Sequence, residues 1–238
     1  MRVTLLASSV AAVDPSCYNR TVNEWWCTAY FSDYRSELVE ATTQHLVITL
    51  AAIVLGIVVA FPLALVARRV PRLESAILGG STALYTIPSL ALFPLLVPFT
   101  GITATTVVIG LALYALTILV RSMLDGLRAV PDEVRESARG LGYGATAQLY
   151  RIELPLALPV MMAGLRVATV STVALTTVGA LVANGGLGNL IAHGVSTDFR
   201  AELLAACLLC VVIAVLLDVL IVAAQRVLTP WTRTGGVS

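Results

Sequence analysis

The chain has 238 residues, of which 58% are hydrophobic and 12% are charged, and its formal net charge at pH 7 is +1. Its mean hydropathy is +0.91. Soluble domains carry roughly 25% charged residues, so this composition excludes an ordinary soluble enzyme, and the nearly balanced charge excludes a basic nucleic-acid-binding domain. The composition predicts an all-α membrane protein.

Residues 1–44 are predicted to form an extracytoplasmic segment that lies partly at the membrane interface. Aromatic residues, which gather at membrane surfaces, are frequent in it: Trp25, Trp26, Tyr30, Phe31 and Tyr34. The apolar run from Val3 to Val13 lacks a convincing signal-peptide cleavage site, and we do not interpret it as one. An oxidising compartment would permit a disulfide between Cys17 and Cys27, but their spacing alone does not decide it.

Five segments of a transmembrane domain, residues 45–227, meet the length of roughly 20 apolar residues that a membrane-spanning helix needs. They are residues 46–66, 75–99, 102–120, 155–182 and 203–225. The chain has no lysine, and most of its arginines lie between spans one and two, between spans three and four, and after span five. Because basic residues concentrate in cytoplasmic loops, the N-terminus is predicted outside, and the tail, residues 228–238, inside.

A charged loop, residues 126–154, separates the third and fourth spans. Pro131 and Asp132 predict the start of a helix, because proline fits the first turn and a carboxylate is favourable at the positive helix end. Three glycines then permit a sharp reversal before a second helix, predicted over residues 145–154. Pro155 marks the return to the membrane. So many charges place the loop in water, on the cytoplasmic side.

The loop also contains a spaced motif, which reads Glu136-Ser137-Ala138, then Gly142, and after nine further residues Ile152-Glu153-Leu154-Pro155. The motif resembles the EAA motif of permease subunits of binding-protein-dependent ABC importers, with serine for the middle alanine. The resemblance implies a coupling helix that docks into a cleft of an ATPase subunit; an ordinary amphipathic loop is the alternative. The implied coupling residues are Glu136, Ser137, Ala138, Arg139, Gly142, Ile152, Leu154 and Pro155.

The resemblance extends over most of residues 45–225 and implies a type I ABC importer permease fold with five transmembrane helices, N-out and C-in. Three segments resemble the permeases for osmoprotectants such as glycine betaine, carnitine, choline and proline betaine: residues 86–93, 154–159 and 185–188. The implied function is ATP-driven import by alternating access across a bacterial plasma membrane. Permeases for methionine or other amino acids are the main alternative, because methionine permeases share the five-span plan and the G-G-L-G turn.

The resemblance implies several partners: two ABC ATPase subunits that bind ATP and Mg, a second permease that is the same chain or a close paralogue, and an extracytoplasmic solute-binding protein. Gly185, Gly186 and Gly188 are implied contacts for the binding protein, unless they serve only as a tight connection. The chain itself has no phosphate-binding G-x-x-x-x-G-K-[ST] loop and no metal-ligand cluster, so we expect neither ATP hydrolysis nor a cofactor in it. An ion-coupled carrier, a channel and a membrane scaffold are alternatives of another class.

Pathway candidates lie in the second and third spans. Pro88 removes a backbone donor and is expected to weaken its helix, which permits bending during transport or reflects packing alone. Aromatic faces bind quaternary ammonium groups, which makes Tyr85, Phe93 and Tyr114 candidate contacts, with packing or lipid exposure as the alternative.

Two charges fall inside the predicted spans. Arg166 lies eleven residues after Pro155 and Asp218 eight residues before Arg226, which places the two at similar depths. An unpaired ion at such a depth is costly. Each charge therefore needs a partner, a water-filled cavity or a route for its head group to the membrane surface. A structural salt bridge between Arg166 and Asp218 is one interpretation, and a cytoplasmic gate or pathway lining is the other.

Overall fold

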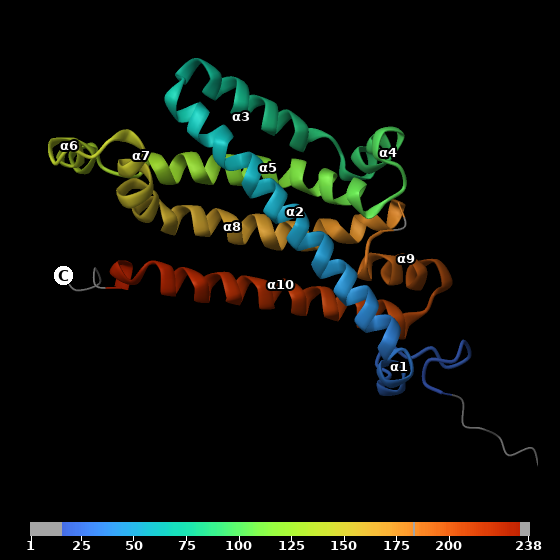
Figure 1. Ribbon diagram of the computed structural model, residues 1–238. Coiled ribbons are helices and arrows are strands. Elements are labelled where there is room, and N and C mark those ends of the chain that lie inside the picture. Colours follow the sequence, from blue (N-terminus) through green and yellow to red (C-terminus); the bar gives the residue numbers. More distant parts are fainter. Residues whose placement is uncertain (1–15, 183, 234–238) are drawn as a thin grey trace, which may run out of the picture.

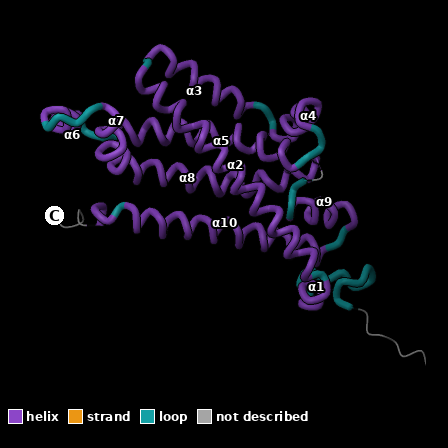
Figure 2. The backbone as a smooth tube through the Cα atoms, in the orientation of Figure 1, coloured by secondary structure: helices purple, strands orange, loops and turns teal. Residues whose placement is uncertain are grey.

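The structure is a computed structural model that describes residues 16–182 and 184–233, so the expectations for residues 1–15 and for the last five residues of the tail lie outside the described residues. The described part consists of helices joined by turns and short loops, without a strand (Figure 2). In chain order the α-helices are α1 (Thr28–Asp33), α2 (Arg35–Arg69), α3 (Pro71–Thr86), α4 (Ser89–Thr100), α5 (Ala104–Arg128), α6 (Asp132–Gly140), α7 (Ala145–Gln148), α8 (Leu154–Thr176), α9 (Leu187–Thr197) and α10 (Arg200–Leu228). A π turn, Leu149–Glu153, joins α7 to α8, and 3₁₀ segments cover Thr177–Val182 and Pro230–Arg233.

The long helices α5, α8 and α10 run alongside one another, and α2 crosses them obliquely (Figure 1). One end of the bundle carries α6 and α7, and the other carries α1, α4 and α9. We call these the α6 end and the α1 end. Four helical stretches of the described chain are long and apolar enough to cross a membrane, namely Arg35–Arg69, Ala104–Arg128, Ala145–Val182 and Arg200–Leu228.

The first membrane helix is longer than the predicted span of residues 46–66. α2 has 35 residues and begins at Arg35, so the predicted boundary between residues 44 and 45 is not a break in the structure. Leu38 and Ala41, on its first turns, are buried in a cluster formed with α1, α9 and α10. The helix therefore continues beyond the predicted span because its apolar face continues.

The predicted span of residues 75–99 is not one continuous helix. α3 and α4 replace it, and they meet at an angle of 101°. Pro88 has no backbone N–H and disfavours a helical conformation at the residue before it; Ile87 accordingly has φ −67° and ψ 125°. The pair is a broken span or a re-entrant loop, and it supplies a fifth candidate crossing only if both halves together cross the membrane.

The centre of the bundle is built from small residues that let helices approach closely. Ala60, Ala64 and Ala67 of α2 are fully buried, in one cluster with Leu119 and Leu124 of α5. Small residues at helix contacts are typical of membrane proteins, in which dispersion and close packing replace the hydrophobic driving force. Large apolar residues face outward instead, among them Val54, Val58, Val211, Val215 and Val219. This distribution fits a bundle surrounded by lipid.

Candidate functional site

The loop that carries the spaced motif projects from the α6 end as α6, a turn and α7 (Figure 1). α6 is followed by Gly142, whose φ of +83° lies in the left-handed region that residues with a Cβ rarely adopt. The Gly142 N–H donates to the Arg139 carbonyl at 2.9 Å, and the Tyr143 N–H donates to the Ala138 carbonyl at 3.1 Å. These two bonds are the Schellman closure of a helix end. Gly142 thus fixes the direction in which the chain leaves α6.

The two halves of the motif meet beside α6. Glu136, Ser137 and Arg139 are exposed, whereas Ala138 is only 2% exposed. Ile152 of the π turn lies beside the same face of α6, although it comes fourteen residues after Ala138 in the sequence. A shallow apolar groove results, lined by Glu133, Val134, Ser137, Ala138, Leu141 and Ile152. The exposed charges and the apolar groove form a surface suited to docking a partner.

The π turn shapes the return of the chain to the bundle. The Leu154 N–H donates to the Leu149 carbonyl, five residues back, instead of four. Pro155, the next residue, has no N–H to donate and lies in the first turn of α8. π turns are uncommon and are frequent at functional sites. Leu154 and Pro155 are half-buried, so they position the loop more than they offer a contact surface.

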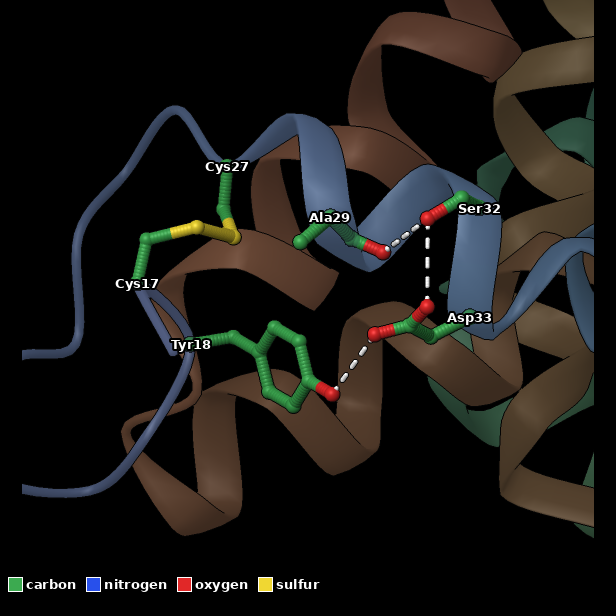
Figure 3. Close-up of a disulfide and its surroundings, with 6 residues drawn as sticks. All are labelled: Cys17, Tyr18, Cys27, Ala29, Ser32 and Asp33. Carbon is green, nitrogen blue, oxygen red and sulfur yellow. Dashed lines mark hydrogen bonds between the residues drawn. A yellow bond between two sulfur atoms is a disulfide. The ribbon is translucent and has the colours of Figure 1, made fainter. Parts of the chain in front are cut away.

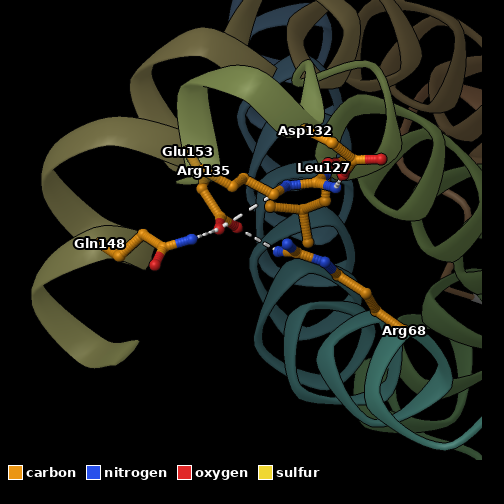
Figure 4. A network of polar contacts seen from close by, with 6 residues as sticks. All are labelled: Arg68, Leu127, Asp132, Arg135, Gln148 and Glu153. Atoms are coloured by element: carbon orange, nitrogen blue, oxygen red, sulfur yellow. Dashed lines mark hydrogen bonds and ion pairs between the residues drawn. The ribbon is translucent and has the colours of Figure 1, made fainter. Parts of the chain in front are cut away.

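Glu153 has no predicted role, yet it is the centre of a buried polar network (Figure 4). Its side chain is 5% exposed. Arg68, from the last turn of α2, donates Nη1 to Glu153 Oε2, and Gln148 donates Nε2 to Oε1 at 2.7 Å. The carboxylate therefore has a cationic partner and an amide partner from two different elements.

Arg135 extends this network to α6. Its Nη1 donates to Asp132 Oδ1 at 2.5 Å, and its Nη2 donates to the Leu127 carbonyl at 2.6 Å, at the end of α5. Its Nε lies 3.8 Å from Glu153 Oε1, which is an ion pair without a hydrogen bond. The helix that bears the exposed motif residues is thereby tied to α5 directly and to Glu153 electrostatically.

Three of the predicted pathway residues meet at the break between α3 and α4. The Tyr114 hydroxyl, from α5, donates to the carbonyl of Ile87, the residue before Pro88. Tyr85 stands edge-on to Tyr114, with ring centroids 5.7 Å apart and planes at 82°. The hydroxyl thus satisfies a carbonyl at the point where the helix ladder is interrupted, so Tyr114 holds the bend in place.

Phe93 lies elsewhere and differs from the expectation of a pathway contact. Its ring is 0% exposed and packs against Gly110 of α5. A Cβ at position 110 would lie 2.7 Å from the Phe93 ring. The ring is therefore a packing element between α4 and α5 in this structure, because the missing side chain at Gly110 makes room for it.

Arg166 of α8 and Asp218 of α10 form a salt bridge, which is one of the alternatives that the sequence leaves open. Arg166 Nε donates to Oδ1 at 2.7 Å, and Nη2 donates to Oδ2 at 2.8 Å. Their side chains are 40% and 28% exposed, so the pair lies at the surface of the isolated chain. A two-bond arginine–carboxylate contact of this geometry fixes both the distance and the orientation of the two side chains.

At the α1 end, Cys17 and Cys27 form a disulfide with Cα atoms 5.6 Å apart (Figure 3). The hydroxyl of Tyr18 donates to Asp33 Oδ2 at 2.8 Å, and this bond raises the pKa of Tyr18. Asn23, inside the disulfide loop, donates Nδ2 to the Asp198 carbonyl at 2.5 Å. The disulfide-closed segment is therefore attached to the turn between α9 and α10.

The glycines predicted to contact a solute-binding protein are buried. Gly185, Gly186 and Gly188 are covered by the first membrane helix and by the 3₁₀ segment Thr177–Val182 that follows α8, so a partner outside the chain cannot reach them directly here. Gly186 has φ +54°, and a Cβ there would lie 2.7 Å from the backbone nitrogen of His45. Glycine is required at position 186 by this close approach, and a Cβ at Gly185 or Gly188 would lie 2.4 Å from the Ala180 backbone nitrogen or 2.2 Å from the Thr177 carbonyl oxygen. Their assignment as contact residues is not supported by their positions.

His45 is a buried polar residue whose role the sequence pattern does not predict. It is completely buried, with Nδ1 3.3 Å from the Gly185 carbonyl and Nε2 3.1 Å from the Val173 carbonyl. The ring therefore links α2 to α8 and to the glycine turn. A lone histidine next to a long apolar run gives no sign of these partners, which lie more than 120 residues away.

The described helices, several of them long and apolar enough to cross a membrane, together with the exposed charged loop at one end, define an integral membrane protein. The chain matches the model of the family described as "Binding-protein-dependent transport system inner membrane component" over residues 48–234, and it belongs to this family. The family is that of ABC importer permeases, and membership implies ATPase and solute-binding partners.

Curated relatives span nearly the same length. The chain is 31% identical over 194 residues to the choline transport system permease protein OpuBB of Bacillus subtilis, covering 82% of this chain and 89% of that protein. It is 35% identical over 206 residues to the osmoprotectant import permease protein OsmW of Salmonella typhimurium, covering 84% of this chain and 96% of that protein. The carnitine transport permease protein OpuCB of Listeria monocytogenes is 34% identical over 175 residues, covering 74% and 80%.

Among solved structures, the chain is similar to one chain of the MetNI methionine ABC transporter in an inward-facing conformation. The TM-score is 0.75, the sequence identity 20%, and the match covers 83% of this chain and 98% of that chain. At this identity the likeness establishes the fold.

Proposed function

We propose that this chain is the permease subunit of an ATP-driven importer for small osmoprotectants, such as choline, glycine betaine, carnitine or proline betaine. The observation that carries the proposal is the α6 surface, on which exposed Glu136 and Arg139 flank an apolar groove closed by Ile152. The substrate class is supported by the names of the relatives, which are permeases for choline, osmoprotectants and carnitine.

The proposed assembly places two permeases, identical or closely related, over two ATPase subunits that bind ATP and Mg. The α6 end faces the cytoplasm and the α1 end faces outward, where a solute-binding protein delivers the substrate, and five segments cross a bacterial plasma membrane. Two features support this orientation: arginines gather at the α6 end, and the disulfide at the α1 end suits an oxidising compartment.

Within this assembly the coupling residues divide into three groups. Glu136, Ser137 and Arg139 offer contacts to the ATPase, while Ala138 and Gly142 set the position and the direction of α6. Leu154 and Pro155 direct the chain back into α8. Alternating access then follows from movement of α6 that is passed to the membrane helices.

Reconstitution tests this function directly. The chain is coexpressed with candidate ATPase and solute-binding subunits from the same genome, purified as a complex and placed in proteoliposomes. Uptake of labelled choline, glycine betaine, carnitine and methionine is then compared. We expect copurification of the ATPase and uptake of a quaternary amine that requires hydrolysable ATP. Uptake of methionine alone would contradict the substrate class, and uptake driven by an ion gradient without ATP would contradict the whole proposal.

A further inference from the structure

The Glu153 network brings together the ends of elements that are far apart in the sequence. Arg68 belongs to the end of α2, Leu127 to the end of α5, Arg135 to α6, and Glu153 to the π turn that leads into α8 (Figure 4). Three of the long helices and the helix that bears the motif are thus linked at one point. That point lies between the proposed docking surface and the membrane bundle.

The buried charge of Glu153 makes the positions of α2 and α6 depend on each other. A buried carboxylate without cationic partners is strongly unfavourable, and Glu153 is held by one arginine on each side, Arg68 and Arg135. Neither arginine lies near Glu153 in sequence, since Arg68 precedes it by 85 residues and Arg135 precedes it by 18. Moving either α2 or α6 away therefore removes one of the two cationic partners of the Glu153 carboxylate.

The two sides of the network are not equivalent. On the α2 side, Arg68 donates directly to Glu153. On the α6 side, Arg135 Nε is buried, has no hydrogen-bond partner among the described residues, and stays 3.8 Å from Oε1. Because hydrogen bonds to oxygen form near 2.9 Å, a shift of about 1 Å would complete this bond. The unsatisfied Nε of Arg135 would therefore gain a hydrogen bond if α6 came closer to Glu153.

We propose that Glu153 is a positioning residue for coupling: it holds α6 in register with α2 and α8, and its contact with Arg135 closes when the ATPase pushes α6 toward the bundle. Movement of the docking surface then reaches α2 through Arg68 as well as α8 through the chain itself. This inference rests on the proposed function, because it needs an ATPase docked at α6.

The first test replaces Glu153 in the complete transporter. Glu153→Gln removes the charge and keeps the size and one acceptor oxygen, and the matched control is Asp125→Asn, which neutralises an exposed carboxylate on α5 near the same end of the bundle. In proteoliposomes we expect Glu153→Gln to assemble with the ATPase and to hydrolyse ATP, while the amount of solute imported per ATP falls by about tenfold or more. The control keeps the wild-type ratio.

An unchanged ratio of import to hydrolysis in Glu153→Gln would overturn the proposal, because a residue with a purely local role leaves this ratio intact. Glu153→Asp provides the conservative comparison: it retains the charge on a shorter side chain and is expected to recover part of the ratio. Recovery no better than in Glu153→Gln would also count against the proposal.

A second measurement does not change Glu153 at all. Arg69 of α2 and Ala145 of α7 are exposed and line one hollow beside the network. Cysteines at these two positions, in a chain whose Cys207 and Cys210 are replaced by alanine, allow a thiol-reactive cross-linker to join α2 to the loop. If the bonds from Glu153 to Arg68 and Gln148 keep α2 and α7 together during transport, the cross-linked transporter imports solute as each single-cysteine control does. Loss of import only on cross-linking would show that α2 and the loop move apart, and would refute the proposal.

These outcomes separate the two proposals. A wild-type complex without ATP-dependent import would refute the proposed function itself. A wild-type complex that imports solute, combined with an unaffected Glu153→Gln variant, would refute only the role of Glu153.

Discussion

Arg166 and Asp218 are joined by two parallel hydrogen bonds that tie α8 to α10 across 52 residues of sequence. Both residues lie within helices long and apolar enough to cross a membrane. In such surroundings each side chain is the natural partner for the charge of the other. The geometry shows that they pair, and exchange of the two charges reveals what the pair contributes.

We expect Arg166→Ala and Asp218→Ala each to reduce solute uptake by about tenfold or more, since each leaves the partner ion without compensation in an apolar environment. The double variant Arg166→Asp with Asp218→Arg restores the pair and is expected to recover most of the uptake. The measurement is ATP-dependent uptake normalised to the amount of permease in the membrane. Normal uptake by Arg166→Ala alone would contradict this account.

Gly142→Ala tests the turn that ends α6. Because Gly142 has φ +83°, a Cβ there adds strain of roughly 1–2 kcal/mol. We expect the tilt of α6 to change and uptake, together with copurification of the ATPase, to fall several-fold. The measurement is recovery of the ATPase on the tagged permease.

Gly144→Ala is the matched control for that substitution. Gly144 has φ −68°, and an added Cβ at either glycine meets no atom within 4 Å. The two variants therefore differ in backbone conformation and not in steric contact. Equal losses in both would show that the conformation at Gly142 is not what matters.

Much of this fold follows from local features of the sequence. Apolar length places the membrane helices, because a span needs a minimum number of residues whatever its neighbours are. The left-handed glycine after α6 is also local, since only that residue type accepts the required φ without strain. Counting residues along two helices that start from opposite membrane faces places Arg166 and Asp218 at similar depths, but only the structure shows that they pair.

Features that depend on contacts between distant segments cannot be predicted from local sequence patterns. Pro88 predicts a weak point, but the direction and the size of the bend depend on the Tyr114 hydroxyl and on packing against α5. Glu153 occupies a variable position of its motif, and no neighbouring residue indicates that Arg68 is its partner. The glycines at 185–188 predict an exposed turn, whereas His45 of α2 and the 3₁₀ segment Thr177–Val182 cover them. In each case the missing information is a contact between segments far apart in sequence.

Tyr114→Phe tests whether the bend between α3 and α4 is held by the hydroxyl. The substitution keeps the ring but removes the donor to the Ile87 carbonyl, and loss of one partner of a buried bond costs roughly 1–3 kcal/mol. We expect a lower thermal unfolding temperature of the purified complex and reduced uptake.

Tyr85→Phe is the comparison for this prediction, because it retains the edge-to-face ring contact with Tyr114. We expect it to unfold at the wild-type temperature. If Tyr114→Phe behaves like Tyr85→Phe, the ring contact and not the hydroxyl stabilises the bend.

The orientation of the chain is testable with thiol chemistry in spheroplasts. In a chain with alanine at Cys207 and Cys210, the only remaining cysteines form the disulfide at the α1 end. A membrane-impermeant maleimide is expected to label them from outside only after reduction, because the bridged sulfurs do not react. A cysteine placed at exposed Tyr150, beside α7, is expected to react only once the membrane is permeabilised. Labelling of position 150 in sealed spheroplasts would reverse the proposed orientation and move the α6 surface away from any cytoplasmic ATPase.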